Sequence, residues 1–109
     1  MSRIEDKLAE MGFELPEPWP YPNANRTAVV QVGSILYVSG HGPGLPDLPS
    51  VRTKGRVGED VSIKEGYAAA RAVMLMIVAS LKQFTGDLDH VKRVVRLFGM
   101  VNGAQDFRD

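Results

Sequence analysis

The alternation of hydrophobic and polar positions predicts a strand pair near residue 30. Residues 28–32 and 35–39 are rich in β-branched and aromatic side chains, and only Gly33 and Ser34 separate them. A two-residue loop with glycine first is typical of a type II′ turn, whose first central residue needs a positive φ. We therefore expect an antiparallel β-hairpin over residues 28–39.

A long amphipathic helix is expected over residues 63–85, because hydrophobic side chains return there every three or four positions. Ser62 and Glu65 form a capping box, in which each side chain accepts a hydrogen bond from the backbone N–H of the other residue. Gly86 then supplies a left-handed terminator. The expected apolar face consists of Ile63, Tyr67, Ala70, Met74, Ile77, Leu81 and Phe84.

The N-terminal region predicts a short helix followed by a stiff arm. Ser2 and Glu5 form another capping box, and the helical spacing of hydrophobic residues continues until Gly12. Four prolines then alternate over residues 15–22. Since proline lacks an N–H and forces the preceding residue into extended conformations, this segment is expected to be polyproline-like.

The remaining chain predicts a loop, two strands and the start of a helix. Glycine and proline make residues 40–50 a loop, and residues 51–57 read as a short edge strand interrupted at Gly55. Residues 91–101 are apolar in both alternating registers, which is typical of a central strand covered on both faces. A turn and the first residues of a further helix, 104–107, are expected after it.

Composition removes several classes of function. The chain has 109 residues and 44% hydrophobic content, which suits one small domain. The absence of cysteine excludes disulfides, cysteine zinc sites and thiol nucleophiles. Thirteen basic and thirteen acidic side chains cancel, so no global field attracts nucleic acid or an anionic membrane. With a charged N-terminus and no uninterrupted apolar run beyond residues 72–79, we expect a soluble cytoplasmic protein.

The order of these segments resembles the Rid family of reactive-intermediate deaminases, also called YjgF or L-PSP endoribonuclease-like proteins. The matching segments are Pro20-Tyr21, 38–43, 63–84, 87–92, 94–101 and Gln105-Asp106-Phe107. The resemblance implies an α+β, chorismate-mutase-like fold, in which helices cover one face of a sheet and three copies form a homotrimer. Residues 1–24 would be an N-terminal helix and arm, and residues 25–109 the Rid-like domain.

The resemblance also implies an activity. Such proteins hydrolyse reactive enamines and imines, such as 2-aminoacrylate and 2-iminopropanoate, to a 2-keto acid and ammonia at sites between subunits. They use no metal or organic cofactor. The family's carboxylate-binding arginine and its acidic residue lie on strands that would follow Asp109, so no catalytic residue is assigned and the chain is expected to be a C-terminally truncated domain. The expected substrate-binding residues are Tyr21, Ser39, Gly40 and His41.

Each of these residues also has a purely structural interpretation. Tyr21 either lies near substrate or packs against Trp19 and the first strand. Ser39 and Gly40 end a strand, so their N–H groups either bind an anion or simply belong to a tight turn. His41 lies between two glycines and is expected to be accessible, whereas His90 is expected to be structural. No acidic side chain stands at ligand spacing from either histidine, so no metal site is expected.

Two other functions stay open. The first is a non-catalytic trimeric protein that binds a small molecule, because the arm and His41 depart from better-characterised family members. The second is the endoribonuclease activity of the family name, for which Lys92, Arg93 and Arg96 form the basic cluster. The neutral net charge argues against nucleic acid as a partner, and we expect a second copy and a small imine or 2-keto acid instead.

Overall fold

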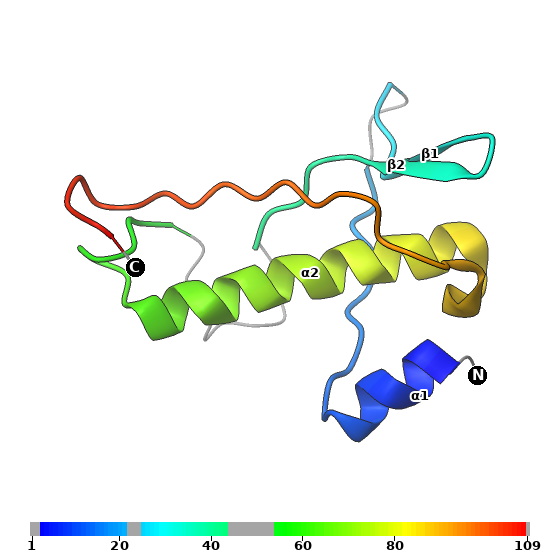
Figure 1. Cartoon of the computed structure of the whole chain (residues 1–109), viewed down its shortest axis with the longest axis horizontal. Coiled ribbons are helices and arrows are strands. Elements are labelled where there is room, and N and C mark those ends of the chain that lie inside the picture. Colours follow the sequence, from blue (N-terminus) through cyan, green and yellow to red (C-terminus); the bar gives the residue numbers. More distant parts are fainter. Residues whose placement is uncertain (1–2, 22–24, 44–53, 109) are drawn as a thin grey trace. The chain divides into compact units, whose positions relative to one another are not determined.

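The structure, a computed structural model, describes residues 3–21, 25–43 and 54–108 (Figure 1). In order, this part of the chain contains helix α1 (Arg3–Glu10), strands β1 (Val29–Val32) and β2 (Ile35–Val38), helix α2 (Ile63–Thr85) and the 3₁₀ helix η1 (Leu88–His90). Two compact units are formed, one by residues 1–41 and 75–93 and the other by 42–74 and 94–109. The α+β class is confirmed.

Strands β1 and β2 form the predicted hairpin. They pair antiparallel, with Val29 opposite Val38 and Val32 opposite Ile35. Of the two loop residues only Gly33 has a positive φ, 61°, which is the signature of the type II′ turn. The N–H of Ser39 donates to the carbonyl of Ala28 at 2.8 Å and extends the pairing by one residue. The hairpin prediction is therefore confirmed.

Helix α2 begins and ends where the sequence predicts. The N–H of Ser62 donates to Glu65 Oε1 and the N–H of Glu65 donates to Ser62 Oγ, both at 3.0 Å, so the capping box is formed. At the other end, Gly86 has a φ of 78° and donates its N–H to the carbonyl of Lys82. The length and composition of α2 would also allow it to cross a membrane, a test that core helices of soluble proteins pass as well.

The apolar face that the sequence predicts for α2 is not the buried face of the helix. Tyr67 and Ile63 are 66% and 55% exposed, and the buried residues of the helix are Ala72, Met76, Ala79 and Ser80. Ala72 follows Ile63 by about two and a half turns, so the two side chains lie on opposite sides. Hydrophobic residues surround much of α2, so periodicity alone did not distinguish the buried face of Ala72, Met76 and Ala79 from the face that carries Ile63 and Tyr67.

Helix α1 ends as predicted. Gly12 has a φ of 83°, the N–H of Phe13 donates to the carbonyl of Leu8, and the N–H of Gly12 donates to the carbonyl of Ala9. This pair of bonds is a Schellman motif, which satisfies the last carbonyls of a helix. Residues 13–21 then contain neither helix nor strand, as expected of the proline-rich arm. Ser2 of the predicted capping box and Pro22 lie outside the described residues.

The carboxylate of Asp89 in η1 caps the N-terminus of α1. Its two oxygens accept hydrogen bonds from the N–H of Arg3 at 2.9 Å and of Ile4 at 3.2 Å. These N–H groups have no partner within the helix, and a negative charge there is favourable. The bond from the Arg3 N–H is the main reason that the pKa of Asp89 lies below its ordinary value. An ion pair of 3.0 Å between Glu5 and Lys82 adds a second attachment of α1.

The predicted strand over residues 91–101 and the helix start over 104–107 are wrong. Residues 91–101 follow an irregular path without strand pairing, and residues 104–107 form one turn closed by the Phe107 N–H and the Ala104 carbonyl at 3.0 Å. A strand needs a neighbour for its backbone groups, and none of the described residues pairs with this segment. Most of its large apolar side chains are therefore exposed: Val94, Val95, Leu97, Phe98, Met100 and Val101.

The predicted edge strand over residues 51–57 is not formed in the part that the structure describes. Residues 51–53 lie outside that part, as do residues 44–50 of the predicted loop. Val57 makes only isolated parallel bridges, to Val61 and to Gly103. The side-chain amide of Asn102 donates to the carbonyl of Gly55 at 3.0 Å, so side-chain bonding replaces a continuous ladder here.

Replacing Asp89 by asparagine is expected to loosen α1 from η1. The helix would lose its charged N-terminal acceptor, and an isolated helix of eight residues is marginal in water. Because the pKa of Asp89 is lowered on folding from its ordinary value of 3.8, the stabilisation by its carboxylate is present above that value and is lost as pH falls through the lower folded pKa. Amide hydrogen exchange in α1 measures the effect, and the control Asp106→Asn should leave the protection of α1 unchanged. Unchanged protection in Asp89→Asn would contradict the prediction.

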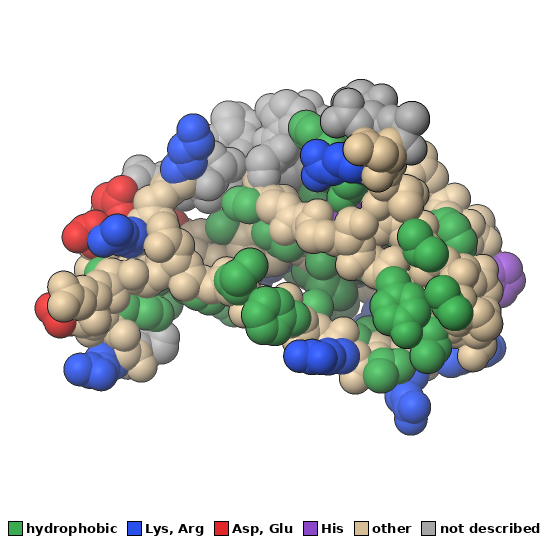
Figure 2. Space-filling model, turned by 90° about the horizontal axis from the view of Figure 1, so that it is seen from above, with side chains coloured by type: hydrophobic (Ala, Val, Ile, Leu, Met, Phe, Trp, Pro, Cys, Tyr) green, Lys and Arg blue, Asp and Glu red, His purple; other side chains and the backbone are tan. Residues whose placement is uncertain are grey.

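The exposed apolar segment 94–101 predicts self-association of the isolated 109-residue chain. Phe98 is 72% exposed and Met100 86% exposed, and Figure 2 shows hydrophobic side chains at the molecular surface among lysines and arginines. We expect light scattering to detect oligomers or aggregates, and Phe98→Lys to reduce them whereas Arg108→Lys does not. Sharp cooperative melting of the unmodified chain as a monomer would refute this expectation.

Candidate functional site

The four residues that the sequence assigns to substrate binding lie together where β2 ends. The hydroxyl of Tyr21 donates to the carbonyl of Gly40 at 3.2 Å. The ring of Tyr21 also meets the imidazole of His41 edge-on, with centroids 6.1 Å apart and planes at 66°. The proline-rich arm and the end of the hairpin therefore meet through direct side-chain contacts.

Tyr21 has an uncommon backbone conformation. Its φ of 44° is the only positive value among the described residues other than glycine. A bulky residue in the left-handed region is strained, and such strain persists only when the surroundings fix it. Besides the hydrogen bond to Gly40, the guanidinium of Arg26 lies 5.6 Å from the centroid of the tyrosine ring. Tyr21 is thus held at both its hydroxyl and its ring face, which favours the site interpretation over simple packing.

Both ring nitrogens of His41 are engaged. Nδ1 lies 2.7 Å from the carbonyl oxygen of Ser39, and Nε2 lies 2.9 Å from Oγ of Ser80 on α2. Because a carbonyl only accepts, we assign the proton of the neutral ring to Nδ1, and Nε2 then accepts from the hydroxyl of Ser80. His41 is half-buried and not as accessible as expected. It connects the end of β2 to α2.

The expectation of two free N–H groups at the strand end is half right. The N–H of Ser39 is used by the hairpin, where it donates to Ala28, and its hydroxyl donates to the carbonyl of Thr27 at 2.5 Å. The N–H of Gly40 has no partner among the described residues. Within the described part of the chain, one backbone donor at the strand end is thus without an acceptor, and such a donor is of the kind that binds anions.

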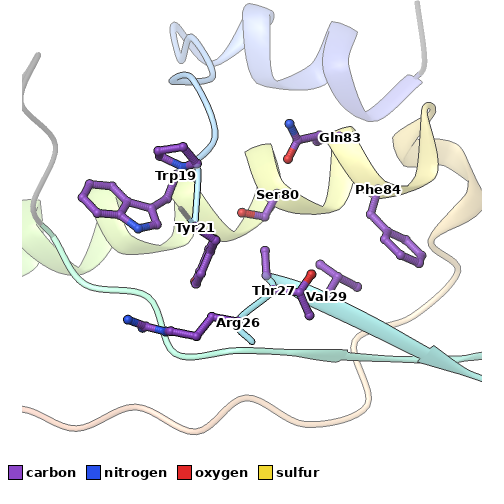
Figure 3. A pocket seen from close by; sticks show the side chains of 10 residues that line it. Trp19, Tyr21, Arg26, Thr27, Val29, Ser80, Gln83 and Phe84 are labelled. Atoms are coloured by element: carbon purple, nitrogen blue, oxygen red, sulfur yellow. The ribbon is translucent and has the colours of Figure 1, made fainter. Parts of the chain in front are cut away.

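An open cavity of about 390 Å³ lies beside Tyr21. Arm, hairpin and α2 contribute its lining: Trp19, Pro20, Tyr21, Arg26, Thr27, Ala28, Val29, Ser80, Gln83 and Phe84. Figure 3 shows the ring of Tyr21 between the side of α2 that carries Ser80 and the side chain of Arg26. None of the described lining residues is acidic, and Arg26 carries the single charge among them.

Sequence reasoning missed Arg26 and Ser80 as residues of this site. Arg26 stands alone before a strand, and no pattern linked it to the arm. Ser80 does carry a signal, because it is a polar residue at a position that turned out to be 1% exposed, but the helical face was assigned the wrong way round. A buried hydroxyl of this kind needs a partner, and His41 is that partner.

His90 and the basic cluster were the other candidates that the sequence offered. Nδ1 of His90 lies 3.3 Å from the carbonyl of Thr85, in keeping with a structural role. Lys92, Arg93 and Arg96 are exposed. The described residues contain no group of three or more histidines or carboxylates that would hold a metal ion.

A double-mutant cycle on Ser80→Ala and His41→Asn is expected to show coupling of about 1 kcal/mol. Ser80→Ala alone removes the donor to Nε2, so we expect a loss of about 1 to 2 kcal/mol in the free energy of unfolding. Denaturant unfolding measures both values, with Ser34→Ala in the turn as control. Strict additivity of the two substitutions would show that the bond contributes nothing.

Comparison with known proteins shows the family of this chain. Residues 5–108 match the model of the family described as "YjgF/chorismate_mutase-like, putative endoribonuclease". The protein TCP17 of Trypanosoma cruzi is 37% identical over 107 residues, which cover 98% of this chain and 65% of TCP17.

A crystal structure described as a "putative endoribonuclease" from Shewanella oneidensis MR-1 resembles the chain with a TM-score of 0.67 and 38% identity. The similarity covers 78% of this chain and 54% of the other, so the chain spans about half to two thirds of these relatives. The resemblance and the chorismate-mutase-like fold inferred from the sequence are confirmed. The chain belongs to the YjgF/chorismate mutase-like family.

Proposed function

We propose that the protein catalyses the hydrolysis of reactive imines of the 2-iminopropanoate type. Water adds to the carbon of the C=N bond, the C–N bond then breaks, and the products are a 2-keto acid and ammonia. One observation carries the proposal: Tyr21, Gly40 and His41, matched to the family by sequence, meet in one contact cluster beside an open cavity.

The site favours this reaction through fixed polar groups. The hydroxyl of Tyr21 and the imidazole of His41 are held in place before substrate arrives, so little reorganisation is needed during the reaction. The N–H of Gly40, which has no partner among the described residues, is a donor for the negatively charged substrate. The proposed chemistry uses no metal or organic cofactor.

The proposed active form is a cytoplasmic homotrimer with its sites between subunits. The exposed apolar side chains of residues 94–101 support self-association, because surfaces of this kind are costly in water. Each copy would contribute Tyr21, Gly40 and His41 as one wall of a site, and the neighbouring copy would contribute the opposite wall.

A second candidate is a non-catalytic small-molecule binding protein. It is favoured by the hydrogen bonds that occupy both ring nitrogens of His41 and the N–H of Ser39, which leave fewer groups free for chemistry. A third candidate is endoribonuclease activity, which the description of the family names. The exposed side chains of Lys92, Arg93 and Arg96 support it.

The test generates 2-iminobutanoate enzymatically in the presence of a trapping nucleophile and follows the 2-keto acid. We expect the purified full-length protein to speed keto-acid formation above buffer. Tyr21→Phe removes the hydroxyl that donates to Gly40, and we expect it to slow the reaction at least about tenfold. Tyr37→Phe, on an exposed tyrosine of β2, is the matched control and should leave the rate unchanged.

No acceleration by the full-length protein would exclude deaminase activity on this substrate. If saturable binding of 2-ketobutanoate persisted in that case, the small-molecule binding function would replace it. Equal rates for Tyr21→Phe and Tyr37→Phe would remove Tyr21 from the site even if the deaminase activity held.

A further inference from the structure

A second cavity, of about 350 Å³, lies beside the turn of the hairpin. Its described lining residues are Gln31, Ser34, Leu36, Phe84, Thr85 and His90. Gln31 and Leu36 stand opposite each other in the strand pair, so they line it from one face of the hairpin. All six residues belong to the compact unit of residues 1–41 and 75–93, and only Phe84 is shared with the described lining of the cavity beside Tyr21. The second cavity is therefore a separate candidate site.

Two side chains in this lining present hydrogen-bond acceptors that no described residue uses. Nε2 of Gln31 donates to the carbonyl of Gly33 at 3.0 Å, which leaves Oε1 without a donor in the described part of the chain. Nδ1 of His90 lies 3.3 Å from the carbonyl oxygen of Thr85. Because a carbonyl only accepts, we assign the proton of the neutral ring to Nδ1, and Nε2 then carries a lone pair. The same two hydrogen bonds orient the amide and the imidazole.

The end of helix α2 adds partial negative charge to the cavity. Thr85 is the last residue of α2 and belongs to the lining. The C-terminus of a helix carries the equivalent of about half a negative charge, because its last carbonyls lack partners within the helix. The hydroxyl of Thr85 donates to the carbonyl of Leu81 at 2.8 Å, so its hydrogen does not offset the acceptors. This end of the cavity therefore favours a positively charged donor.

Leu36 and Phe84 give the cavity an apolar wall. Phe84 is 45% exposed and Leu36 is half-buried, so apolar surface of both side chains faces water. A cation near the face of an aromatic ring is attracted by the ring quadrupole. The volume of the cavity falls within the range of small-molecule sites, roughly 300 to 1,000 Å³. A ligand with both a cationic and an apolar part satisfies these features together.

We propose that this second cavity binds primary ammonium ions that carry an apolar group. An ammonium has three N–H donors and no acceptor, so it matches Oε1 of Gln31, Nε2 of His90 and the negative end of α2. Its apolar group covers Leu36 and Phe84. A carboxylate would instead bring further acceptors to a set of acceptors. This inference does not rest on the proposed deaminase function.

The test follows the imidazole NMR signals of the two histidines of the chain. At about pH 8 primary alkylamines are protonated and free imidazole is neutral. Titration of the full-length, histidine-labelled protein with 2-phenylethylamine is expected to shift the signals of His90 saturably and to leave those of His41 in place. The expected dissociation constant is on the order of 1 to 10 mM, as suits a ligand of this size. 2-Phenylethanol, which lacks the charge, and methylammonium, which lacks the apolar group, should each bind at least about fivefold more weakly.

Substitution of Gln31 provides a gain of binding as well as a loss. Gln31→Glu places a negative charge at the acceptor and is expected to tighten the binding of 2-phenylethylammonium at least about threefold. Gln31→Leu removes the acceptor and should weaken binding at least about threefold. Gln105→Glu adds the same charge at an exposed glutamine outside the described lining and should bind like the unmodified protein. The comparison of ammonium and alcohol on the unmodified protein does not depend on the folding of any variant.

Three results would overturn the proposal. Equal affinity for 2-phenylethylammonium and 2-phenylethanol would show that the acceptors do not recognise a cation. Equal tightening by Gln31→Glu and Gln105→Glu would reveal attraction to the net charge instead of a site at Gln31. A shift of His90 by Zn²⁺ without any response to the ammonium would identify a metal ligand instead. Because the titrations need no turnover, a failure here leaves the proposed deaminase function untouched, and an inactive protein leaves this inference untouched.

Discussion

The hydrogen bond between Nε2 of His41 and Oγ of Ser80 is the contact on which the candidate site depends. A hairpin of two four-residue strands is marginally stable by itself, and most of its side chains are exposed. The bond fixes the end of β2 to the buried face of α2. Because Gly40 directly precedes His41 in the chain, the same bond positions Gly40. The carbonyl of Gly40 then accepts the hydrogen bond that positions Tyr21.

Local signals in the sequence were sufficient for the elements that depend on local chemistry. The II′ turn at Gly33, the capping box of Ser62 and Glu65, and the left-handed residues Gly12 and Gly86 all lie where the sequence predicts. Each is decided within a few residues by backbone geometry. The clustering of Tyr21 with His41, by contrast, was inferred from a family resemblance, since no spacing rule links residues in the arm and in the hairpin.

Features that depend on distant partners were beyond sequence reasoning. The alternation of residues 94–101 predicts a strand, yet strand pairing needs a neighbour that the described residues do not provide. The face of α2 that carries Ile63 and Tyr67 was expected inside, whereas Ala72, Met76, Ala79 and Ser80 are the buried residues of the helix. Asp89 could not be recognised as the cap of α1, because the two segments lie more than eighty residues apart.

The cap at Asp89 has a consequence for the arm between α1 and the site. The chain from Glu10 to Tyr21 follows helix α1, whose N-terminus is capped by Asp89, and ends at Tyr21, whose hydroxyl donates to Gly40. The arm therefore connects two attached points. Each extended residue adds roughly 3.3 Å. Adding or losing one residue in this segment would therefore change the reach of the arm by about the spacing of one residue, and Tyr21 could keep its bond to Gly40 only if the arm changed its path.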